Sequence, residues 1–192
     1  PNPGDYKTMP VGDISVIVVR DTNGTLNAMV NRCAHRGNLV CVEDHGNLDC
    51  LTCVYHNWTY DLDGNLATIA FEKGIQGQGG MAEDFDKSCH ALQRLRVEEY
   101  CGLVFGSFSE EVQSLPEYFG TEMCKNIQRV LGRDMEILGK FQHGLDGNWK
   151  LYMENVRDTY HATLLHSFMT TFRLNRLSMK GAVEVSEGGL HH

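Results

Sequence analysis

Apolar and β-branched residues near the start of the chain predict a β-hairpin. Residues 14–20 (ISVIVVR) form one such run, and residues 26–30 (LNAMV) form a second. Residues 21–24 (DTNG) between them have the composition of a tight turn. The second run of this predicted hairpin leads toward Cys33.

Three further segments continue the β pattern. Residues 51–60 and 101–108 each predict a strand, and we expect the second of these strands to be buried. Residues 61–65 (DLDGN) supply another turn. Short strands joined by such turns are typical of a small β domain.

The pattern changes after Ser109. Residues 110–131 have helix-like spacing despite Pro116, and residues 135–141 have the composition of a strand. We therefore expect a boundary between two domains near residues 110–116.

A second helix is predicted from Asn148 onward. Its apolar positions recur at helical intervals, and they are Trp149, Tyr152, Met153, Val156 and Tyr160. This spacing predicts that one face of the helix packs into a core.

Composition and charge restrict the possible functions. The chain has 192 residues, of which 42% are hydrophobic, and this is enough to bury a real core. A formal net charge of −8 argues against a nucleic-acid surface. No apolar stretch is long enough to span a membrane, and the first residues lack the features of a secretory signal. We therefore expect a soluble cytoplasmic protein that has neither nucleic acid nor a membrane as a partner.

Two short couplets of metal-ligand residues dominate the sequence, Cys33 with His35 and Cys53 with His56. In a Rieske cluster, two thiolates hold one iron and two imidazoles hold the other. The alternating order of the ligands suits such a cluster held between two loops, because each loop can give one ligand to each iron. The alternative is a structural zinc site, although zinc fingers usually place two cysteines before two histidines.

Two further observations bear on this interpretation. The remaining cysteines show no disulfide-like framework, so we expect reduced and mostly buried thiols at Cys41, Cys50, Cys89, Cys101 and Cys124. Rieske proteins of respiratory complexes carry an extra cysteine inside the second couplet, where this chain has Val54 and Tyr55. The difference favours the lower-potential oxygenase or ferredoxin type.

A second constellation, made of Asp158, His161 and His166, predicts a site for one more iron. Two histidines are the nitrogen ligands of the facial site of non-haem iron oxygenases. On a regular helix Asp158 and His161 would share one side, whereas His161 and His166 would point about 140° apart. We therefore predict that the helix ends, kinks or bulges between the two histidines. A buried structural histidine and a surface carboxylate are the alternatives.

The order of these motifs resembles the α subunit of Rieske non-haem iron ring-hydroxylating oxygenases, and the resemblance covers most of the chain. It implies an α+β fold. Residues 1–112 would be a small antiparallel β Rieske [2Fe-2S] domain. Residues 113–192 would be the N-terminal, incomplete part of a mixed α/β catalytic domain of helix-grip type. The chain is thus expected to be a fragment of a longer subunit.

The same resemblance implies roles for individual residues. The ligands of the [2Fe-2S] cluster would be Cys33, His35, Cys53 and His56. His161 and His166 would bind a mononuclear Fe(II), and Asp158 would bridge the two metal centres across a subunit boundary. The third, carboxylate ligand of that iron is expected outside this chain.

The implied activity is that of a terminal oxygenase component that hydroxylates an aromatic carboxylate with O2. Its electrons would come from NAD(P)H through a reductase, with or without a ferredoxin, and it would assemble as a trimer, with or without β subunits. Residues 71–81 and 164–172 resemble the branch that acts on terephthalate, salicylate or anthranilate. Arg173 and Arg176 are candidates for holding the substrate carboxylate, and exposed helix-flanking charge explains them equally well.

Two other classes of protein remain open. A Rieske ferredoxin-type electron carrier would use the first site and leave the second motif without a function. A zinc-stabilised interaction module would have no redox activity, and it would explain neither the ligand order nor the second pair of histidines.

Overall fold

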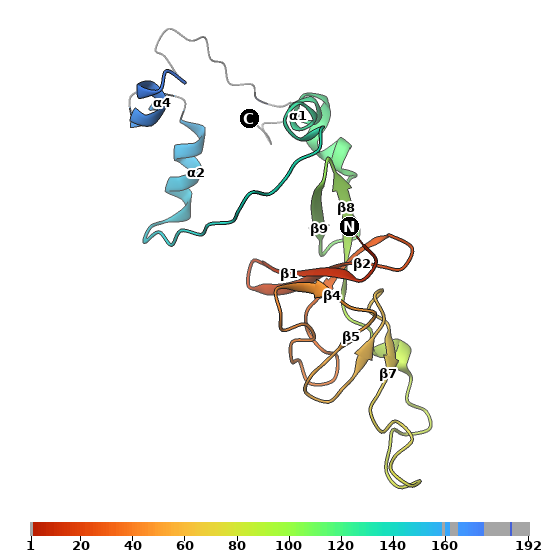
Figure 1. The fold of residues 1–192 in the computed structure, drawn as a ribbon. Coiled ribbons are helices and arrows are strands. Elements are labelled where there is room, and N and C mark those ends of the chain that lie inside the picture. The colour runs from red at the N-terminus through yellow and green to blue at the C-terminus, as the bar shows by residue number, and fades with distance from the viewer. Residues whose placement is uncertain (1, 159, 162–164, 175–184, 186–192) are drawn as a thin grey trace. The chain divides into compact units, whose positions relative to one another are not determined.

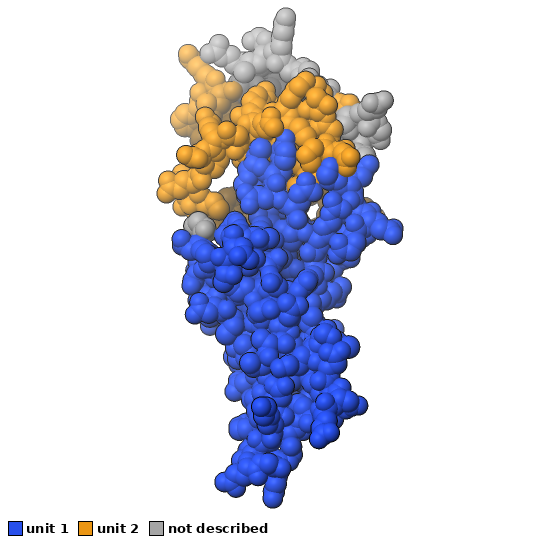
Figure 2. Space-filling view, turned by 90° about the vertical axis from the view of Figure 1, so that its right-hand side faces the viewer, with its two compact units in different colours: residues 1–114 blue, residues 115–192 orange. Residues whose placement is uncertain are grey.

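The computed structural model describes residues 2–158, 160–161, 165–174 and 185. The chain divides into two compact units, residues 1–114 and 115–192, which Figure 2 shows in different colours. Strands build the first unit, and the described elements of the second unit are helices.

Two antiparallel sheets form the first unit (Figure 1). The larger sheet has the order β4-β1-β2-β3-β8-β9, and the smaller sheet has the order β5-β6-β7. The larger sheet consists of β1 (Asp5–Val11), β2 (Ile14–Arg20), β3 (Leu26–Val30), β4 (His45–Asn47), β8 (Arg94–Tyr100) and β9 (Leu103–Ser107). The smaller sheet consists of β5 (Leu51–Thr52), β6 (Thr59–Tyr60) and β7 (Leu66–Thr68). A short 3-10 helix, η1 (Lys87–His90), precedes β8.

The hairpin of β2 and β3 confirms the first prediction from the sequence, because both strands have the expected bounds and pair antiparallel. Asp21 fixes the turn between them. Its carboxylate accepts the backbone N–H of Asn23 at 2.8 Å and that of Thr25 at 2.7 Å, which is the role that aspartate commonly has in turns. The hairpin therefore fixes the direction in which the chain runs from β3 toward Cys33.

Strand β2 is apolar on both faces. Ile17 and Val19 belong to a large buried cluster that also contains Cys33 and Cys53. Val16 belongs to a second, smaller cluster, because neighbouring residues of a strand point to opposite faces. Each buried valine or isoleucine side chain contributes about 1.5–3 kcal/mol to the stability of the fold. The larger cluster thus places the two cysteines of the couplets in the main core of the unit.

Strand β8 pairs with two neighbours in turn. Its first residues pair with β3, and residues from Arg96 to Tyr100 pair with β9. The β8–β9 hairpin therefore extends beyond the rest of the sheet (Figure 1). The prediction of a strand over residues 101–108 is confirmed, but its expected burial is wrong, since Leu103 and Val104 are 41% and 43% exposed. The strand lies at the edge of the sheet and has one neighbouring strand.

The described helices of the second unit are α1 (Leu115–Leu131), α2 (Trp149–Arg157) and α4 (Ser167–Thr171). Helix α1 confirms the helix predicted over residues 110–131. Pro116 lies in its first turn, where the N–H group that proline lacks has no partner within the helix. Gly120 interrupts the helix with a φ of 71°, a left-handed conformation that glycine adopts at low cost.

Two predictions for the second unit are wrong. Residues 135–141 do not form a strand. The apolar face of α2 does not lie in a core, because Trp149, Tyr152 and Val156 are 70%, 61% and 61% exposed. The periodicity identified the helix correctly, but an apolar face becomes buried only where another element packs against it.

Within the described part of the chain, no helix is long and apolar enough to cross a membrane. The cysteines are free thiols. The expectation of mostly buried thiols outside the couplets is wrong, since Cys41 is buried but Cys50 and Cys89 are exposed and Cys101 and Cys124 are intermediate. Burial raises the pKa of Cys41 to about 11, so its reactive thiolate form is scarce at neutral pH.

Candidate metal sites

The two couplets lie on two turns that close in the same way. In the first turn, the backbone N–H of Cys33 donates to the carbonyl of Asn38 at 2.8 Å, and the carbonyl of Cys33 accepts the N–H of Gly37 at 2.9 Å. In the second turn, the N–H of Cys53 donates to the carbonyl of Trp58 and its carbonyl accepts the N–H of Asn57, both at 2.9 Å. The backbone N–H and carbonyl groups of each cysteine therefore make the hydrogen bonds that close its turn.

The closure of both turns requires one residue in a left-handed conformation. Gly37 has a φ of 76° and Asn57 has a φ of 54°, and glycine and asparagine are the residues that tolerate this region best. The second turn joins β5 to β6, so the prediction that residues 51–60 form one continuous strand is wrong. The second couplet lies on a loop, as the first does.

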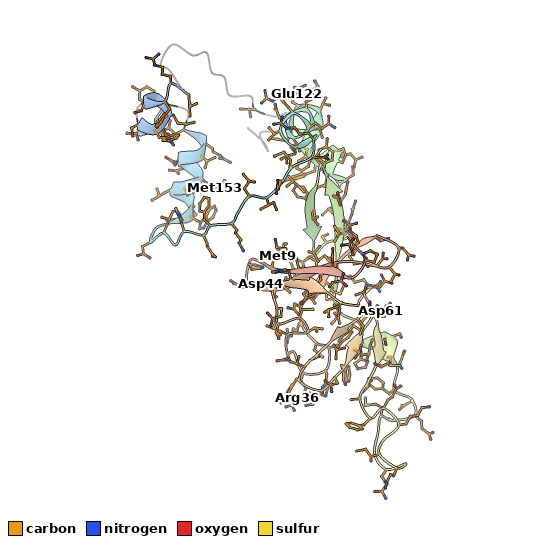
Figure 3. The ribbon with its side chains drawn as sticks, viewed as in Figure 1. Met9, Arg36, Asp44, Asp61, Glu122 and Met153 are labelled. Carbon is orange, nitrogen blue, oxygen red and sulfur yellow. The ribbon has the colours of Figure 1, made fainter. Side chains whose placement is uncertain are left out.

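The turns bury the two cysteines and expose the two histidines of the couplets. Cys33 and Cys53 are 3% and 1% exposed, whereas His35 and His56 are exposed and their ring centroids lie 4.6 Å apart. Arg36, on the first turn, lies well apart from Met9 of β1 and from Asp44 (Figure 3). One face of the unit thus presents two imidazoles, with two thiols behind them in the core.

This donor set fits a [2Fe-2S] cluster. The described residues contain no group of three or more histidine, cysteine or acidic side chains that could hold a single metal ion. A Rieske cluster needs no such group, because each of its irons takes two ligands from the protein and the others from sulfide. Desolvation, with smaller contributions from His56 and Arg36, lowers the pKa of His35 and so favours the neutral imidazole that binds metals.

Each buried sulfur also has a polar group beside it. The hydroxyl of Tyr60 lies 3.2 Å from Cys33 Sγ and accepts the backbone N–H of Ala34 at 3.0 Å. The side-chain amide of Asn38 donates toward Cys53 Sγ across 3.9 Å. Burial and the contact with Cys33 raise the pKa of Tyr60, so this phenol keeps its proton and can donate it to a thiolate.

An aromatic cluster packs against one of the exposed imidazoles. The buried ring of Trp58 stacks on His35 with the ring centroids 4.8 Å apart and an angle of 12° between the planes. Phe85 and His90 contact the indole edge-on, with ring centroids 5.9 and 5.6 Å away. These rings form part of the lining of an open hollow of about 610 Å³ beside His35 and His56. Trp58 therefore packs directly against one of the two imidazoles of the couplets.

The second constellation is also brought together, although not on a helix. Helix α2 ends at Arg157, and Asp158 is its C-cap residue, so Asp158 and His161 do not share a helical face as expected. The carboxylate of Asp158 instead accepts the N–H of Tyr160 at 2.8 Å and lies 3.0 Å from His161 Nδ1. The helix thus ends before His161, earlier than the predicted break between the two histidines. Residues 162–164 lie outside the described residues.

The geometry of the histidine pair fits a shared metal ion. The Nε2 atoms of His161 and His166 lie 3.2 Å apart. Two imidazole nitrogens about 2.1 Å from one ion, at an angle between about 90° and 110°, lie about 3.0–3.4 Å apart. Asp158 is hydrogen-bonded to Nδ1 of His161, which leaves Nε2 free to bind a metal. The hydrogen bond from Tyr160 and, less strongly, the contact with His161 lower the pKa of Asp158 and keep it ionised.

The comparisons with known proteins agree with this geometry. Residues 1–78, which contain both couplets, match the Rieske [2Fe-2S] domain family. Over all 192 residues, the chain is 53% identical to the terephthalate 1,2-dioxygenase terminal oxygenase component subunit alpha 2 of a Comamonas species. It is 48% identical to the anthranilate 1,2-dioxygenase large subunit of Burkholderia cepacia over the same length. Over its whole length, the chain is thus similar to the large subunits of Rieske oxygenases.

Solved structures resemble the chain over both of its units. Naphthalene 1,2-dioxygenase from a Rhodococcus species, solved with indole bound, matches 92% of the chain with a TM-score of 0.77 and 32% identity. The quaternary ammonium Rieske monooxygenase CntA in complex with L-carnitine matches 88% of it with the same TM-score and 28% identity. The chain spans about half the length of its relatives, namely 46% of the terephthalate subunit and 40% of the naphthalene enzyme. The predicted antiparallel β Rieske domain, followed by part of a catalytic domain, is thereby confirmed.

Two side chains beside the cysteines of the couplets, Tyr60 and Asn38, were not predicted from the sequence. A signal was available for Asn38, because Asn38 and Trp58 each follow a cysteine of a couplet by five residues. Tyr60 lies in a predicted strand and gives no such signal. Arg173 is exposed and Arg176 lies outside the described residues, so neither candidate gains support.

Proposed function

We propose that the protein is the terminal oxygenase component of an aromatic ring-hydroxylating dioxygenase. It would accept electrons at a Rieske cluster, pass them to a mononuclear non-haem iron and hydroxylate an aromatic carboxylate with O2. The observation that carries the proposal is the pair of Nε2 atoms of His161 and His166, 3.2 Å apart, in a chain that also has a complete set of Rieske ligands. An electron carrier has no use for a second metal site of this kind.

Four side chains would hold the cluster: Cys33, His35, Cys53 and His56. The thiolates would bind the inner iron and the imidazoles the outer iron, in keeping with their burial and exposure. When bound, the cluster would supply one-electron transfer, and the mononuclear iron would supply activation of O2. The hydroxyl of Tyr60 would donate to the sulfur of Cys33, and the stacked ring of Trp58 would fix the plane of His35.

His161, His166 and Asp158 would form the second centre. Asp158 would orient His161 through Nδ1, and its carboxylate is still about half exposed, so it can accept a further N–H group. We propose that this group is an imidazole that holds the cluster in a neighbouring subunit, so that Asp158 links the two centres. The third ligand of the iron would be a carboxylate from outside this chain.

The proposed substrate is an aromatic carboxylate of the terephthalate, anthranilate or salicylate type. The support is the identity to subunits named for these compounds, which is 53%, 48% and 41% for the terephthalate, anthranilate and salicylate relatives. A reductase that oxidises NAD(P)H would supply the electrons, with or without a ferredoxin. We further propose a trimer of such subunits, with or without β subunits, located in the cytoplasm.

The content of iron and acid-labile sulfide tests the proposal. The purified full-length protein should contain about three irons and two sulfides per subunit, and a Rieske signal should appear in electron paramagnetic resonance spectra after reduction. His161→Ala should lower the iron content by about one per subunit and leave the sulfide unchanged. His143→Ala, an exposed histidine of the same unit, is the matched control and should change neither value.

The same measurement separates the rival functions. Two irons with two sulfides in the unmodified protein would favour the electron carrier, and zinc without sulfide would favour the interaction module. Oxygen uptake with the reductase and NADH should then rise on addition of terephthalate, anthranilate or salicylate. If it rises only with an uncharged ring such as naphthalene, the proposed substrate class is wrong.

A further inference from the structure

Asn31 is a buried polar residue outside both couplets. It directly follows β3, is 2% exposed, and its side chain makes four hydrogen bonds. Its Oδ1 accepts the backbone N–H groups of Val40 and Cys41, both at 2.9 Å. Its Nδ2 donates to the carbonyl of Cys41 at 2.7 Å and to the hydroxyl of Ser15 at 3.2 Å. The amide thus uses both of its lone pairs and both of its hydrogens.

These bonds close the segment that carries the first two ligands. Asn31 lies at the start of the segment and Cys41 at its end, with Cys33 and His35 between them. The backbone N–H of Asn31 also donates to the carbonyl of Ser15 in β2 at 2.8 Å. The segment is therefore fastened to the central strands of the sheet at the point where it begins and ends.

The second ligand loop is closed by different means. Its ends are the paired strands β5 and β6, in which Leu51 lies opposite Tyr60 and Thr52 opposite Thr59. The first loop follows β3, but no described strand pairs with its other end at Val40 and Cys41. The side-chain amide of Asn31 bonds to both the N–H and the carbonyl of Cys41, as the backbone of a paired strand would do. One side chain thus replaces a strand at the base of the first loop.

We propose that Asn31 is a positioning residue for the Rieske cluster, which acts by holding the first ligand loop in its metal-binding shape. The proposal rests on the cluster site of the proposed function and not on the second iron site. Ordering a loop costs conformational entropy at each of its residues. The hydrogen bonds of Asn31 order this loop when the protein folds, so less entropy is lost when the metal binds. A closed loop also presents Cys33 and His35 in one orientation, so the bound cluster has a single environment.

The test compares two asparagines of the same region, Asn27 within β3 and Asn31 directly after it. Asn31→Ala removes the side-chain hydrogen bonds to the backbone of Val40 and Cys41. Asn27→Ala is the matched control, because the amide of Asn27 bonds to the carbonyl of Leu62 and the carboxylate of Asp63 at the turn after β6, away from the first loop. Three quantities are measured on each cluster-loaded protein: the amide hydrogen exchange of Val40 and Cys41, the width of the lines in the paramagnetic resonance spectrum, and the rate of iron release to a chelator.

Asn31→Ala should speed exchange at Val40 and Cys41 about tenfold or more, broaden the resonance lines, and speed iron release at least about threefold. Asn27→Ala should leave all three quantities unchanged, even if it lowers the stability of the fold. Equal effects of the two substitutions on the resonance lines and on iron release would overturn the proposal, as would an unchanged spectrum in Asn31→Ala.

A measurement on the unmodified protein covers the case in which Asn31→Ala does not fold. Asn31 Oδ1 is the acceptor of the Val40 and Cys41 amides, so both should exchange at least about tenfold more slowly than unstructured amides. Exchange at the unstructured rate would overturn the proposal. Neither the exchange rates nor the resonance lines of the cluster involve the mononuclear iron or oxygenase activity, so failure here is distinguishable from failure of the proposed oxygenase function.

Discussion

The two metal sites differ in how much of their support comes from the described residues. The Rieske ligands lie on two closed turns, and their cysteines belong to the main core cluster of the first unit. The histidine pair follows the end of α2, and its main support is the side chain of Asp158, which is itself about half exposed. The cluster site is therefore built into the core of its unit, whereas the second site depends on a few local contacts. Substitutions that act on one site alone test this difference.

The largest effect is expected from a ligand in the core. Cys53→Ser should remove nearly all cluster absorption and the Rieske resonance signal, because Cys53 is a proposed thiolate ligand and is buried. Iron bound at His161 and His166 should remain, since it does not depend on the first unit for ligands. Metal and sulfide analysis measures both.

The control for this change is Cys50→Ser. Cys50 is an exposed thiol close to the same turn, and its replacement should leave the cluster intact. If Cys50→Ser removes the cluster as Cys53→Ser does, or if Cys53→Ser retains it, the ligand assignment of the second turn is incorrect.

A smaller effect is expected at the link between the sites. Asp158→Asn should leave both metals bound but lower turnover about 10- to 100-fold, because an amide orients and polarises an imidazole less well than a carboxylate does. Steady-state oxygen uptake measures turnover, and single-turnover reduction of the second iron shows which step is slow. Asp146→Asn, an exposed carboxylate in the same unit, should retain normal turnover. Normal electron transfer in Asp158→Asn would remove the case for a bridge.

The smallest effect is expected on the reduction potential of the cluster. Tyr60→Phe removes the hydroxyl that lies 3.2 Å from Cys33 Sγ. A hydrogen bond to sulfur stabilises the more negative, reduced cluster, so its loss should lower the reduction potential. A bond of about 1 to 1.4 kcal/mol corresponds to a shift of about 40–60 mV for one electron.

Protein-film or optical titration measures this potential. Tyr55→Phe is the control, because Tyr55 is exposed and lies in the second turn. A potential that rises in Tyr60→Phe, or that falls equally in Tyr55→Phe, would contradict the assigned hydrogen bond.

The sequence predicted the parts of this molecule that depend on local pattern. The β2–β3 hairpin was predictable from its β-branched runs and the turn residue Asp21, and both couplets from ligand spacing. Two kinds of feature were not predictable. One is tertiary contact, such as the amide of Asn31 on Cys41 or the ring of Trp58 on His35, because residues far apart in sequence meet there. The other is burial, as in α2 and β9. An apolar pattern predicts which face of a segment can be buried, but it does not predict whether another element packs against that face.

The burial of Cys33 and Cys53 behind the exposed His35 and His56 determines where electrons can enter and leave this site. A donor protein and an acceptor would find the shortest route to the metals through the same pair of imidazoles. In the proposed assembly, one imidazole would face Asp158 of a neighbouring subunit, so a donor protein would have to reach the cluster past the other imidazole. Delivery and withdrawal of electrons would thus use different histidines of the same cluster.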